Sequence, residues 1–535
     1  MSSEPTVSPA TLLAFLQDPA SYPYSPDRIE IVQTHISYVA LAPPYVYKVK
    51  KAVDLGFLDF STPARRRHFC EEEVRVNRRL CPDLYLGVVA ITQEADGLRF
   101  DGPGPPVTYA VKMCYLPDDG FLHRRLQQGT LSQDDLARVV DTLADFYRQT
   151  PRPEVAEWGR IERLRINTDE NAEQTRAVVG DLIAPPAYEA LRWYNDWFYT
   201  HRARLLNERR VGGHLVDGHG DLRLEHIHLT PERVCIYDAI EFNERFRFLD
   251  VAADMAFLAM DLDVHGRPDL ARFVVRRLAE RRRDPALYDL VDFYKCYRAY
   301  VRGKVEMMRS REDEVPPAER EASRDRARRY FRQALRYAVA GSQPLVLVVM
   351  GRTGSGKTTQ ARALADVLGW AHVSSDRIRK AQAGVPLHRR GSSEERARLY
   401  AAERTDATYA ALTRIAVERA EQGQGTVLDA TFGDRHRREA LREALRARGV
   451  PWVFVELEAA PEARRARLQA RETASDVVSD ARLEDVDRLD ARYDPPDALE
   501  DAVHLIARAD AGVEATTRDI LRAIIPLEPG RAATP

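Results

Sequence analysis

The chain has 535 residues, of which 44% are hydrophobic and 30% are charged, and its 80 Lys plus Arg against 82 Asp plus Glu give a net charge of −2. This length exceeds what one hydrophobic core usually covers, so we expect two or more domains. The composition excludes disordered and collagen-like chains, and the near-neutral charge lacks the overall basic footprint of a nucleic-acid-binding protein.

The cysteine pattern and the N-terminal sequence bear on whether the protein is cytoplasmic, secreted or membrane-bound. The five cysteines are scattered and show no CxxC spacing, which is typical of reduced thiols rather than of disulfides or a zinc site. The first residues carry no basic stretch before an apolar core, and no run of about 18 uncharged apolar residues follows. We therefore expect a soluble, cytoplasmic protein with no membrane partner.

The first part of the chain has patterns of both strands and helices. Alternating apolar residues over Ile29–Val53, with a proline pair inside, predict two strands and a turn. Helical spacing over Pro63–Leu80 is followed by two further strand patterns, residues 88–93 and 107–117, around a Gly- and Pro-rich loop. After Gly120 the pattern is mostly helical, interrupted by strand-like pieces and a polar loop at residues 214–242.

The second part repeats the order strand, loop, helix. A charged helical stretch at residues 310–340 looks like a connector, and from Leu345 the repeated order predicts a parallel α/β sheet. We expect one domain over residues 1–309, the connector over 310–340, and a second domain over 341–535.

A glycine-rich loop opens the second domain. The apolar run LVLVVM (345–350) precedes GRTGSGKTT (351–359), which matches the phosphate-binding pattern G-x-x-x-x-G-K-[ST] between a strand and a helix. Its backbone N–H groups can surround phosphates, Lys357 can reach the β and γ phosphates, and the Thr358 hydroxyl can ligate Mg²⁺. The predicted nucleotide-binding residues here are Gly351, Arg352, Thr353, Gly354, Ser355, Gly356, Lys357, Thr358 and Thr359.

Two further motifs follow predicted strands. HVSSDRIRK places Asp376 and Arg379 three residues apart, so that both face one cleft from the first turn of a helix. GTVLDATF places Asp429 after an apolar strand, where a carboxylate can hold the Mg²⁺ shell.

Residues 345 to 510 resemble the P-loop kinases that include gluconate kinases, zeta toxins and polynucleotide 5′-kinases, with an AAA-type ATP-binding core. The resemblance implies that Asp376 accepts the proton of an attacking hydroxyl and that Arg379 holds the acceptor. It also implies that Arg467 and Arg471, in RARLQAR, clamp the transferring phosphate. Two plainer interpretations stay open: these arginines also suit a solvated helix face, and Asp376 also suits a helix cap.

A second constellation lies in the first domain. The segment HGDLRLEHIHLTPERVCIYDAIEF supplies Asp221, His226 five residues later, and Asp238 twelve residues beyond that. An aspartate in such a loop can accept a hydroxyl proton, and a second carboxylate can hold Mg²⁺ between nucleotide phosphates.

Residues 25 to 310 resemble the aminoglycoside phosphotransferase family, a protein-kinase-like fold whose catalytic loop reads H-G-D-x-x-x-x-N. The resemblance implies that Asp221 is the base, that Lys48 pairs with nucleotide phosphates, and that Glu73 orients Lys48. Two departures stand out: His226 occupies the position of the Asn metal ligand, and no Gly-rich loop precedes Lys48. Lys50 lies on the same strand face and is an alternative phosphate lysine.

Together these patterns predict an α+β bilobal kinase-like domain followed by an α/β P-loop domain. We expect a bifunctional, MgATP-dependent phosphotransferase acting on hydroxyl groups of small molecules. Two alternatives stay open. In the first, the P-loop domain phosphorylates polynucleotide 5′-hydroxyls, although the near-neutral net charge of the chain disfavours binding of nucleic acid. In the second, the first domain is a degenerate nucleotide-binding regulatory module and only the P-loop domain is active.

Overall fold

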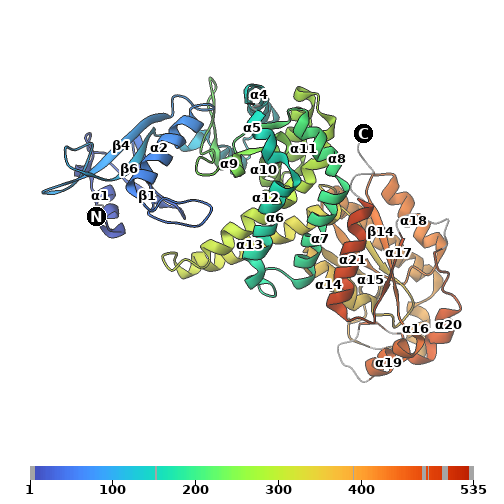
Figure 1. Cartoon of the computed structure of the whole chain (residues 1–535). Helices are drawn as coiled ribbons and strands as arrows, with labels where there is room; N and C mark the ends of the chain where they lie inside the picture. Colours follow the sequence, from blue (N-terminus) through green and yellow to red (C-terminus); the bar gives the residue numbers. More distant parts are fainter. Residues whose placement is uncertain are drawn as a thin grey trace. The chain divides into compact units, whose positions relative to one another are not determined.

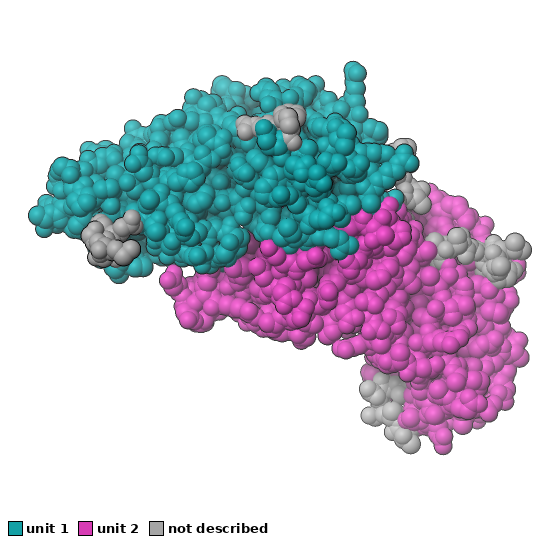
Figure 2. Space-filling view, in the orientation of Figure 1, with its two compact units in different colours: residues 1–167, 202–295 teal, residues 168–201, 296–535 magenta. Residues whose placement is uncertain are grey.

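The computed structural model describes residues 7–150, 153–389, 391–472, 478–479, 481–496 and 504–528. Packing divides the chain into two compact units, each made of two separate stretches (Figure 2). Unit 1 contains Met1–Asn167 and Arg202–Lys295, and unit 2 contains Thr168–His201 and Cys296–Pro535. The domain limits predicted near residues 309 and 341 stay a prediction.

Unit 1 begins with a six-stranded antiparallel sheet in the order β1-β2-β3-β6-β4-β5 (Figure 1). Its strands are β1 (Glu30–Gln33), β2 (Ser37–Ala42), β3 (Tyr45–Lys50), β4 (Tyr85–Glu94), β5 (Gly97–Phe100) and β6 (Pro106–Cys114). Three strands therefore form where the sequence predicts two. The first turn contains neither Gly nor Pro, and is closed by Thr34, whose N–H donates to the Ser37 carbonyl (2.9 Å) and whose hydroxyl accepts from the Ser37 N–H (3.0 Å).

Helix α2 (Pro63–Asn77) packs on β4 and β6. It begins where the Thr62 hydroxyl accepts a hydrogen bond from the Arg65 N–H (3.2 Å), with a proline in the first turn, which is a favourable helix start. The buried face of the helix carries Cys70, Glu73 and Val74. Glu73 is thereby directed toward β3 and its two lysines.

The remainder of unit 1 is mainly helical. Two small antiparallel ribbons interrupt it: β7 (Leu215–Asp217) pairs with β10 (Phe248–Asp250), and β8 (Ile227–Leu229) pairs with β9 (Val234–Ile236). Besides α2, the helices that lie wholly or partly in this unit are α1 (Pro9–Gln17), α3 (Leu122–Gln127), α4 (Gln133–Gln149), α5 (Pro153–Ala156), α6 (Ile161–Thr175), α8 (Ala203–Val211), α9 (Glu244–Arg247), α10 (Val251–Val264), α11 (Pro268–Arg282) and α12 (Tyr288–Arg309). Helix α10 is buried on all sides, so its aspartates lie inside the protein.

The expectation of reduced thiols throughout is wrong for one pair. Cys81, after α2, and Cys235, in β9, form a disulfide with their Cα atoms 4.8 Å apart. Cys70, Cys114 and Cys296 are free. The pair is 154 residues apart in sequence and is brought together only by the fold, so residue spacing could not reveal it.

Unit 2 contains a five-stranded parallel sheet in the order β12-β13-β11-β14-β15, which confirms the predicted parallel α/β sheet of the C-terminal part. Its strands are β11 (Val346–Met350), β12 (Ala371–Ser374), β13 (Thr426–Asp429), β14 (Trp452–Glu458) and β15 (His504–Arg508). The middle strand β11 is wholly buried, as its uninterrupted apolar sequence predicts.

Helices surround this sheet (Figure 1). They are α14 (Lys357–Leu368), α15 (Ser375–Gln382), α16 (Ser393–Leu399), α17 (Ala402–Glu421), α18 (Arg435–Arg446), α19 (Pro461–Glu472), α20 (Val486–Asp490) and α21 (Val513–Ile524). Helices α17 and α18 share an apolar cluster with the sheet, and α14 packs with α21.

Two helices from before the sheet belong to the same unit. Helix α7 (Pro185–His201) packs on α21, and α13 (Pro317–Ala340), within the predicted connector, packs on α14. The Arg336 guanidinium donates to the carbonyls of Leu368 (2.7 Å) and Gly369 (2.6 Å), and so satisfies the C-terminal end of α14. None of the described helices combines the length and the apolar run that crossing a bilayer would need.

Candidate nucleotide sites

The phosphate-binding loop of unit 2 connects β11 to α14. Gly354 has φ +82°, and a Cβ there would lie 2.9 Å from the Arg464 carbonyl oxygen, so the position requires glycine. The Lys357 ammonium donates to the Arg352 carbonyl (2.8 Å) across the loop. The buried Ser355 hydroxyl finds no hydrogen-bond partner among the described residues. A loop with an unsatisfied hydroxyl and an inward-facing ammonium suits an anionic ligand.

The Lys357 ammonium is electrostatically perturbed. Removal from water lowers its pKa to about 8, and the carboxylates of Asp429 and Asp376 only partly oppose this shift. The nearby guanidiniums of Arg471 and Arg464 lower the pKa further. Phosphate oxygens in the loop would supply the negative charge that this group lacks.

Asp376 and Arg379 lie together, three residues apart in α15, as predicted. The Arg379 guanidinium donates to Asp376 Oδ1 (3.2 Å) and lies over the Tyr400 ring, with Cζ 4.2 Å from the ring centroid. Tyr400 Oη also donates to Asp376 Oδ1 (3.4 Å). The residue before α15 is Ser374, so Asp376 is not its N-cap. Tyr400 carries no sequence signal for this site because it is 24 residues away, after α16.

The two residues predicted to ligate Mg²⁺ through oxygen, Thr358 and Asp429, lie in α14 and in the neighbouring strand β13. Thr358 is the second residue of α14, and Asp429 is the last residue of β13, where it is buried with Oδ2 3.2 Å from His372 Nε2. Hydroxyl and carboxylate oxygens are the donors that Mg²⁺ prefers, so the pair fits this ion. Within the described ranges no three His, Cys, Asp or Glu side chains gather as a ligand set. Nucleotide phosphates would have to complete the coordination.

Helix α19 brings several arginines to the loop. Arg467 donates to the carbonyls of Ser355 (2.9 Å) and Ala509 (3.2 Å), so it contacts the phosphate loop rather than only solvent. Arg471, one turn later, is close enough for its charge to act on the pKa of Lys357.

A third arginine of α19, Arg464, was not predicted. It forms two hydrogen bonds with the Asp490 carboxylate (2.8 and 2.6 Å) and donates to the Thr353 carbonyl (2.8 Å). The Arg352 guanidinium also donates to the backbone carbonyl of Asp490 (3.0 Å). Thr359 is exposed on α14. The arginine-rich sequence of α19 does not by itself distinguish which arginine faces the loop.

In unit 1, Lys48 lies between two carboxylates. Its Nζ is 2.8 Å from Glu73 Oε1 and 2.5 Å from Asp238 Oδ1. The Lys48 side chain is 13% exposed, whereas Glu73 is fully buried. Burial alone would raise the pKa of Glu73, but the two ammoniums hold it below its ordinary value. Strand β3, helix α2 and the loop that carries Asp238 therefore meet at the Lys48 ammonium. The pair of Lys48 with Glu73 was predicted from the sequence.

Lys50 has a different position on the same strand. Its Nζ is 2.7 Å from Glu73 Oε2 and pairs with Glu241, which the sequence analysis did not identify, and its side chain is only 1% exposed. Burial raises the pKa of Glu241. Because Lys50 is enclosed by two buried carboxylates, Lys48 is the lysine with access to a ligand.

Aspartates of α10 hold the loop that carries Asp221. The Asp254 carboxylate accepts hydrogen bonds from the N–H groups of His219 (2.8 Å) and Gly220 (2.9 Å), and Asp261 accepts one from Leu224 (3.0 Å). Gly220 has φ +86°, and a Cβ there would lie 2.8 Å from the Phe246 carbonyl. Burial lowers the pKa of His219, which fits a neutral structural role.

Asp221 is paired with an arginine two residues later. Arg223 donates to both of its carboxylate oxygens (3.1 Å each). His226 Nδ1 donates to the Asp221 carbonyl (2.8 Å), and its Nε2 lies 3.5 Å from Asp238 Oδ2. Asp238 has φ +63°, and although burial acts to raise its pKa, Lys48 and His226 hold it well below the ordinary value. The Asp238 oxygens suit Mg²⁺, and an imidazole nitrogen suits it poorly.

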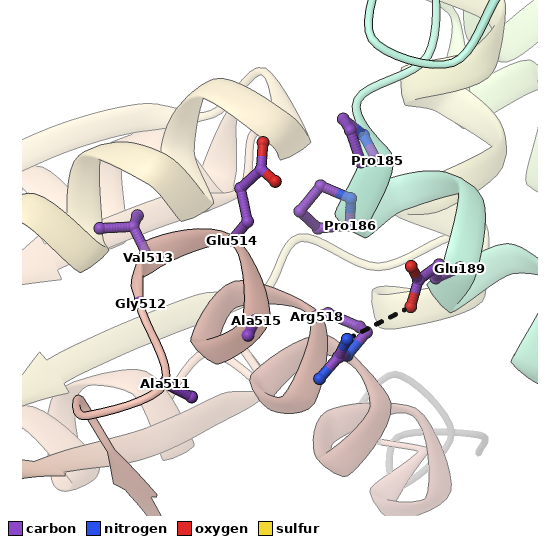
Figure 3. Close-up of a pocket in the computed structure, with 9 residues that line it drawn as sticks. All are labelled: Pro185, Pro186, Glu189, Ala511, Gly512, Val513, Glu514, Ala515 and Arg518. Carbon is purple, nitrogen blue, oxygen red and sulfur yellow. Dashed lines mark ion pairs between the residues drawn. The ribbon is translucent and has the colours of Figure 1, made fainter.

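A separate cavity of about 450 Å³ lies in unit 2 between the first turns of α7 and α21 (Figure 3). Pro185, Pro186 and Glu189 form one side, and the ion pair between Glu189 and Arg518 (3.5 Å) crosses to the other. No predicted site residue lines it.

Comparisons with known proteins place the C-terminal part in a described class. A family model described as an AAA domain matches residues 346–496, which include the phosphate loop, Asp376 and Asp429. With the parallel sheet, this identifies the C-terminal part as a P-loop nucleotide-binding domain. Among solved structures, a gluconokinase from Sinorhizobium meliloti 1021 is 20% identical, with a TM-score of 0.26, over 35% of this chain and 94% of that one. Chaetomium thermophilum Kti12 in complex with ADP-AlF3 is 23% identical, with a TM-score of 0.26, over 34% of this chain and 96% of that one.

Longer matches come from mycobacteria. The uncharacterized protein Rv2004c of Mycobacterium tuberculosis (strain ATCC 25618 / H37Rv) is 30% identical over 423 residues, which are 77% of this chain and 80% of that protein. The uncharacterized protein Mb2027c of Mycobacterium bovis matches to the same extent. The chain therefore belongs to the family of these mycobacterial proteins, and combines an N-terminal antiparallel-sheet region with a P-loop nucleotide-binding domain.

Proposed function

We propose that the chain is an ATP-dependent phosphotransferase with two catalytic sites, each of which moves a γ-phosphoryl group to a hydroxyl of a small molecule. The observation that carries the C-terminal assignment is the set of charged groups at one loop. Lys357 and Arg467 bond to carbonyls of the loop, and the Asp376 carboxylate, which Arg379 pairs, acts on the pKa of Lys357.

At the C-terminal site, Asp376 is the base. Its carboxylate takes the proton of the acceptor hydroxyl while that oxygen bonds to the γ-phosphorus and the bond to the β-phosphate oxygen breaks, releasing ADP. Arg379 holds the acceptor, and Lys357 with Arg467 and Arg471 neutralises charge on the transferring group. Mg²⁺, held by Thr358 and Asp429 when bound, would screen the phosphate charges.

A specific observation supports the second site, in a kinase-like unit 1. An ion pair of a strand lysine with a helix glutamate, Lys48 with Glu73, lies next to Asp238, as the protein-kinase type of ATP site requires. Asp221 is the base there, and its two bonds from Arg223 hold the carboxylate in position. Asp238, with His226, would hold the metal.

The test is phosphate transfer from γ-labelled ATP to a panel of sugars, aminoglycosides, nucleosides and 5′-hydroxyl oligonucleotides. Wild type is compared with Asp221→Asn and Asp376→Asn. We expect each variant to lose a different product by about 10²-fold or more, the size typical for loss of a general base. The matched controls are Asp96→Asn and Asp366→Asn, which remove exposed carboxylates from the same units.

The outcomes separate the alternatives. If Asp221→Asn leaves every product unchanged while Asp376→Asn abolishes all of them, unit 1 is a regulatory nucleotide-binding module and only the P-loop site is active. If labelled product appears only with oligonucleotides, the P-loop site is a polynucleotide 5′-kinase. If no acceptor is labelled by the wild type above the level of both variants, phosphotransfer is the wrong assignment.

A further inference from the structure

The disulfide of unit 1 lies beside the proposed N-terminal nucleotide site. Cys235 is three residues before Asp238, and Cys81 lies between the end of α2, which carries Glu73, and the start of β4. Both cysteines are 1% exposed. Their Cα separation of 4.8 Å is within the range that a disulfide spans without backbone movement.

We propose that Cys81 and Cys235 are a reversible thiol–disulfide site that fixes the position of Asp238. The consequence for nucleotide binding rests on the N-terminal site proposed above, whereas the consequence for the backbone at Asp238 does not.

The same two segments are also joined by hydrogen bonds. The Asp238 N–H donates to Tyr85 Oη (3.2 Å), and the Ala239 N–H donates to Asn77 Oδ1 (2.7 Å). Asn77 Nδ2 donates back to the Ala239 carbonyl (3.4 Å). Residues 77–85 and 235–239 are therefore held together by one covalent bond and three hydrogen bonds, and all of these links lie within four residues of Cys81 or Cys235.

These links matter because of the backbone conformation of Asp238. Its φ of +63° is in the left-handed region, which a residue with a side chain keeps only when its surroundings enforce it. Without the disulfide, the hydrogen bonds and the ion pair with Lys48 would have to maintain that conformation. Reduction is therefore expected to let Asp238 leave its place opposite Lys48, which lies 2.5 Å away in the disulfide form.

The chemical step is exchange with a low-molecular-weight disulfide. One cysteine thiolate attacks that disulfide, forms a mixed disulfide and releases one thiol. The second thiolate then attacks the protein sulfur and releases the other thiol, so that two protein thiols and one small disulfide give one protein disulfide and two small thiols. Because both sulfurs are buried, exchange requires transient local opening. Cys70 is suited to remain a thiol, because burial raises its pKa to about 12.

The first experiment measures the redox state of the pair in the full-length protein. The protein is equilibrated in reduced or oxidised glutathione, alkylated, and each cysteine is quantified by mass spectrometry. We expect Cys81 and Cys235 to change together between the buffers, and Cys296, in unit 2, to be alkylated to the same extent after denaturation in both. A pair that reacts fully in both buffers, or in neither, overturns the proposal.

The second experiment follows the backbone by hydrogen exchange in the same two buffers. The Asp238 and Ala239 amides should lose protection by about tenfold or more on reduction, since their local opening no longer strains a covalent link. Cys235→Ser should resemble the reduced wild type in both buffers, and Cys114→Ser, a change of a free cysteine in the same unit, should keep the response. If the Asp238 and Ala239 amides of the wild type are equally protected in both buffers, the proposal is overturned. This outcome does not depend on whether either variant folds.

The third measurement separates this proposal from the proposed function. A fluorescent ATP analogue with Mg²⁺ is titrated into the Lys357→Ala chain, in which the P-loop site is disabled. We expect binding about threefold or more weaker after reduction, because Asp238 is no longer preorganised. If the amides respond to reduction and no nucleotide binds in either buffer, the N-terminal phosphotransferase assignment fails and the redox site stands. Equal nucleotide affinity in both buffers would contradict control of the N-terminal nucleotide site by the disulfide.

Discussion

Single charged groups set the expected behaviour of both sites, and Lys357 gives the clearest pH dependence. Its pKa of about 8 lies below the ordinary lysine value, so the free loop loses this positive charge as the pH rises through 8. Phosphate groups favour the charged form of Lys357. Above pH 8, nucleotide binding is therefore accompanied by uptake of a proton at the Lys357 amine. ATP affinity should fall about tenfold between pH 7 and pH 9, the ratio of the charged fractions at those values.

Calorimetry in two buffers of different ionisation enthalpy measures this proton uptake. The Lys48→Ala chain is used so that only the P-loop site binds. Lys357→Arg is the control because arginine stays charged, and its affinity, although weaker, should not change with pH. A wild-type loop whose affinity is the same at pH 7 and pH 9 would contradict the expected titration.

The two lysines of β3 should separate binding from stability. Lys50→Met leaves Glu73 and Glu241 buried without their shared cation, which we expect to cost about 3 to 5 kcal/mol of unfolding free energy. Lys48→Met should cost less, since Lys48 is partly exposed, but should abolish nucleotide binding at the N-terminal site. Denaturant unfolding and nucleotide titration of both variants measure the difference. A larger loss of stability for Lys48→Met would reverse the assignment.

Sequence patterns predicted the residues of each proposed site whose spacing is local. The phosphate loop, the pair Asp376 and Arg379, and the series through Asp221 and Asp238 each lie within a short segment. Tyr400 and Asp490 were not found because they are distant in sequence from the motifs that they join. Glu241 lies only three residues after Asp238 but matches no position of the motif. The Cys81–Cys235 pair shows the same limit over a longer separation.

At the scale of elements, α19 depends on one arginine. Arg464 connects α19, the phosphate loop and α20 through the Asp490 carboxylate and the Thr353 carbonyl. Lysine cannot reproduce the two parallel bonds, so Arg464→Lys should cost about 2 to 4 kcal/mol of unfolding free energy and weaken ATP binding.

The adjacent residue provides a matched control. Arg465, on the same helix, is 60% exposed and makes a single contact with Asp487 at 3.3 Å. Arg465→Lys should change the unfolding free energy by less than about 1 kcal/mol, as for other surface ion pairs. Similar losses for both variants in urea denaturation would show that the Asp490 contact does not anchor α19.

Element type was easier to predict than element number. Apolar runs and the loop motif predicted the parallel sheet because its central strands, β11 and β13, are buried along their whole length. The N-terminal sheet gave three strands from a stretch that predicts two, since its first turn uses side-chain bonds of Thr34 rather than Gly or Pro.

At the scale of the whole molecule, the discontinuity of unit 2 has an experimental consequence. A fragment that begins at residue 341 contains the entire P-loop sheet but lacks α7 and α13, which pack on α21 and α14. It would uncover the surfaces of α21 and α14 on which these two helices pack, and it would leave the C-terminal carbonyls of α14 without Arg336. We expect it to aggregate or to unfold at a temperature at least about 10 °C lower than the full chain, as loss of several kcal/mol implies.

The comparison uses thermal unfolding and size-exclusion chromatography. A control fragment begins at residue 296, keeps α13 and the whole second stretch of unit 2, and is co-expressed with residues 168–201 as a separate peptide. It should be more soluble than the fragment from 341. A 341 fragment that is monomeric and as stable as the full chain would show that these helices are dispensable for the sheet.

The interleaved order of the two units also bears on how such a gene can change. One crossover at the middle of the gene would separate the codons for residues 168–201 from those for the strands with which they fold. Exchange of either half as an independent cassette would therefore disrupt both products at once. Under that constraint the two halves are expected to be inherited and lost together.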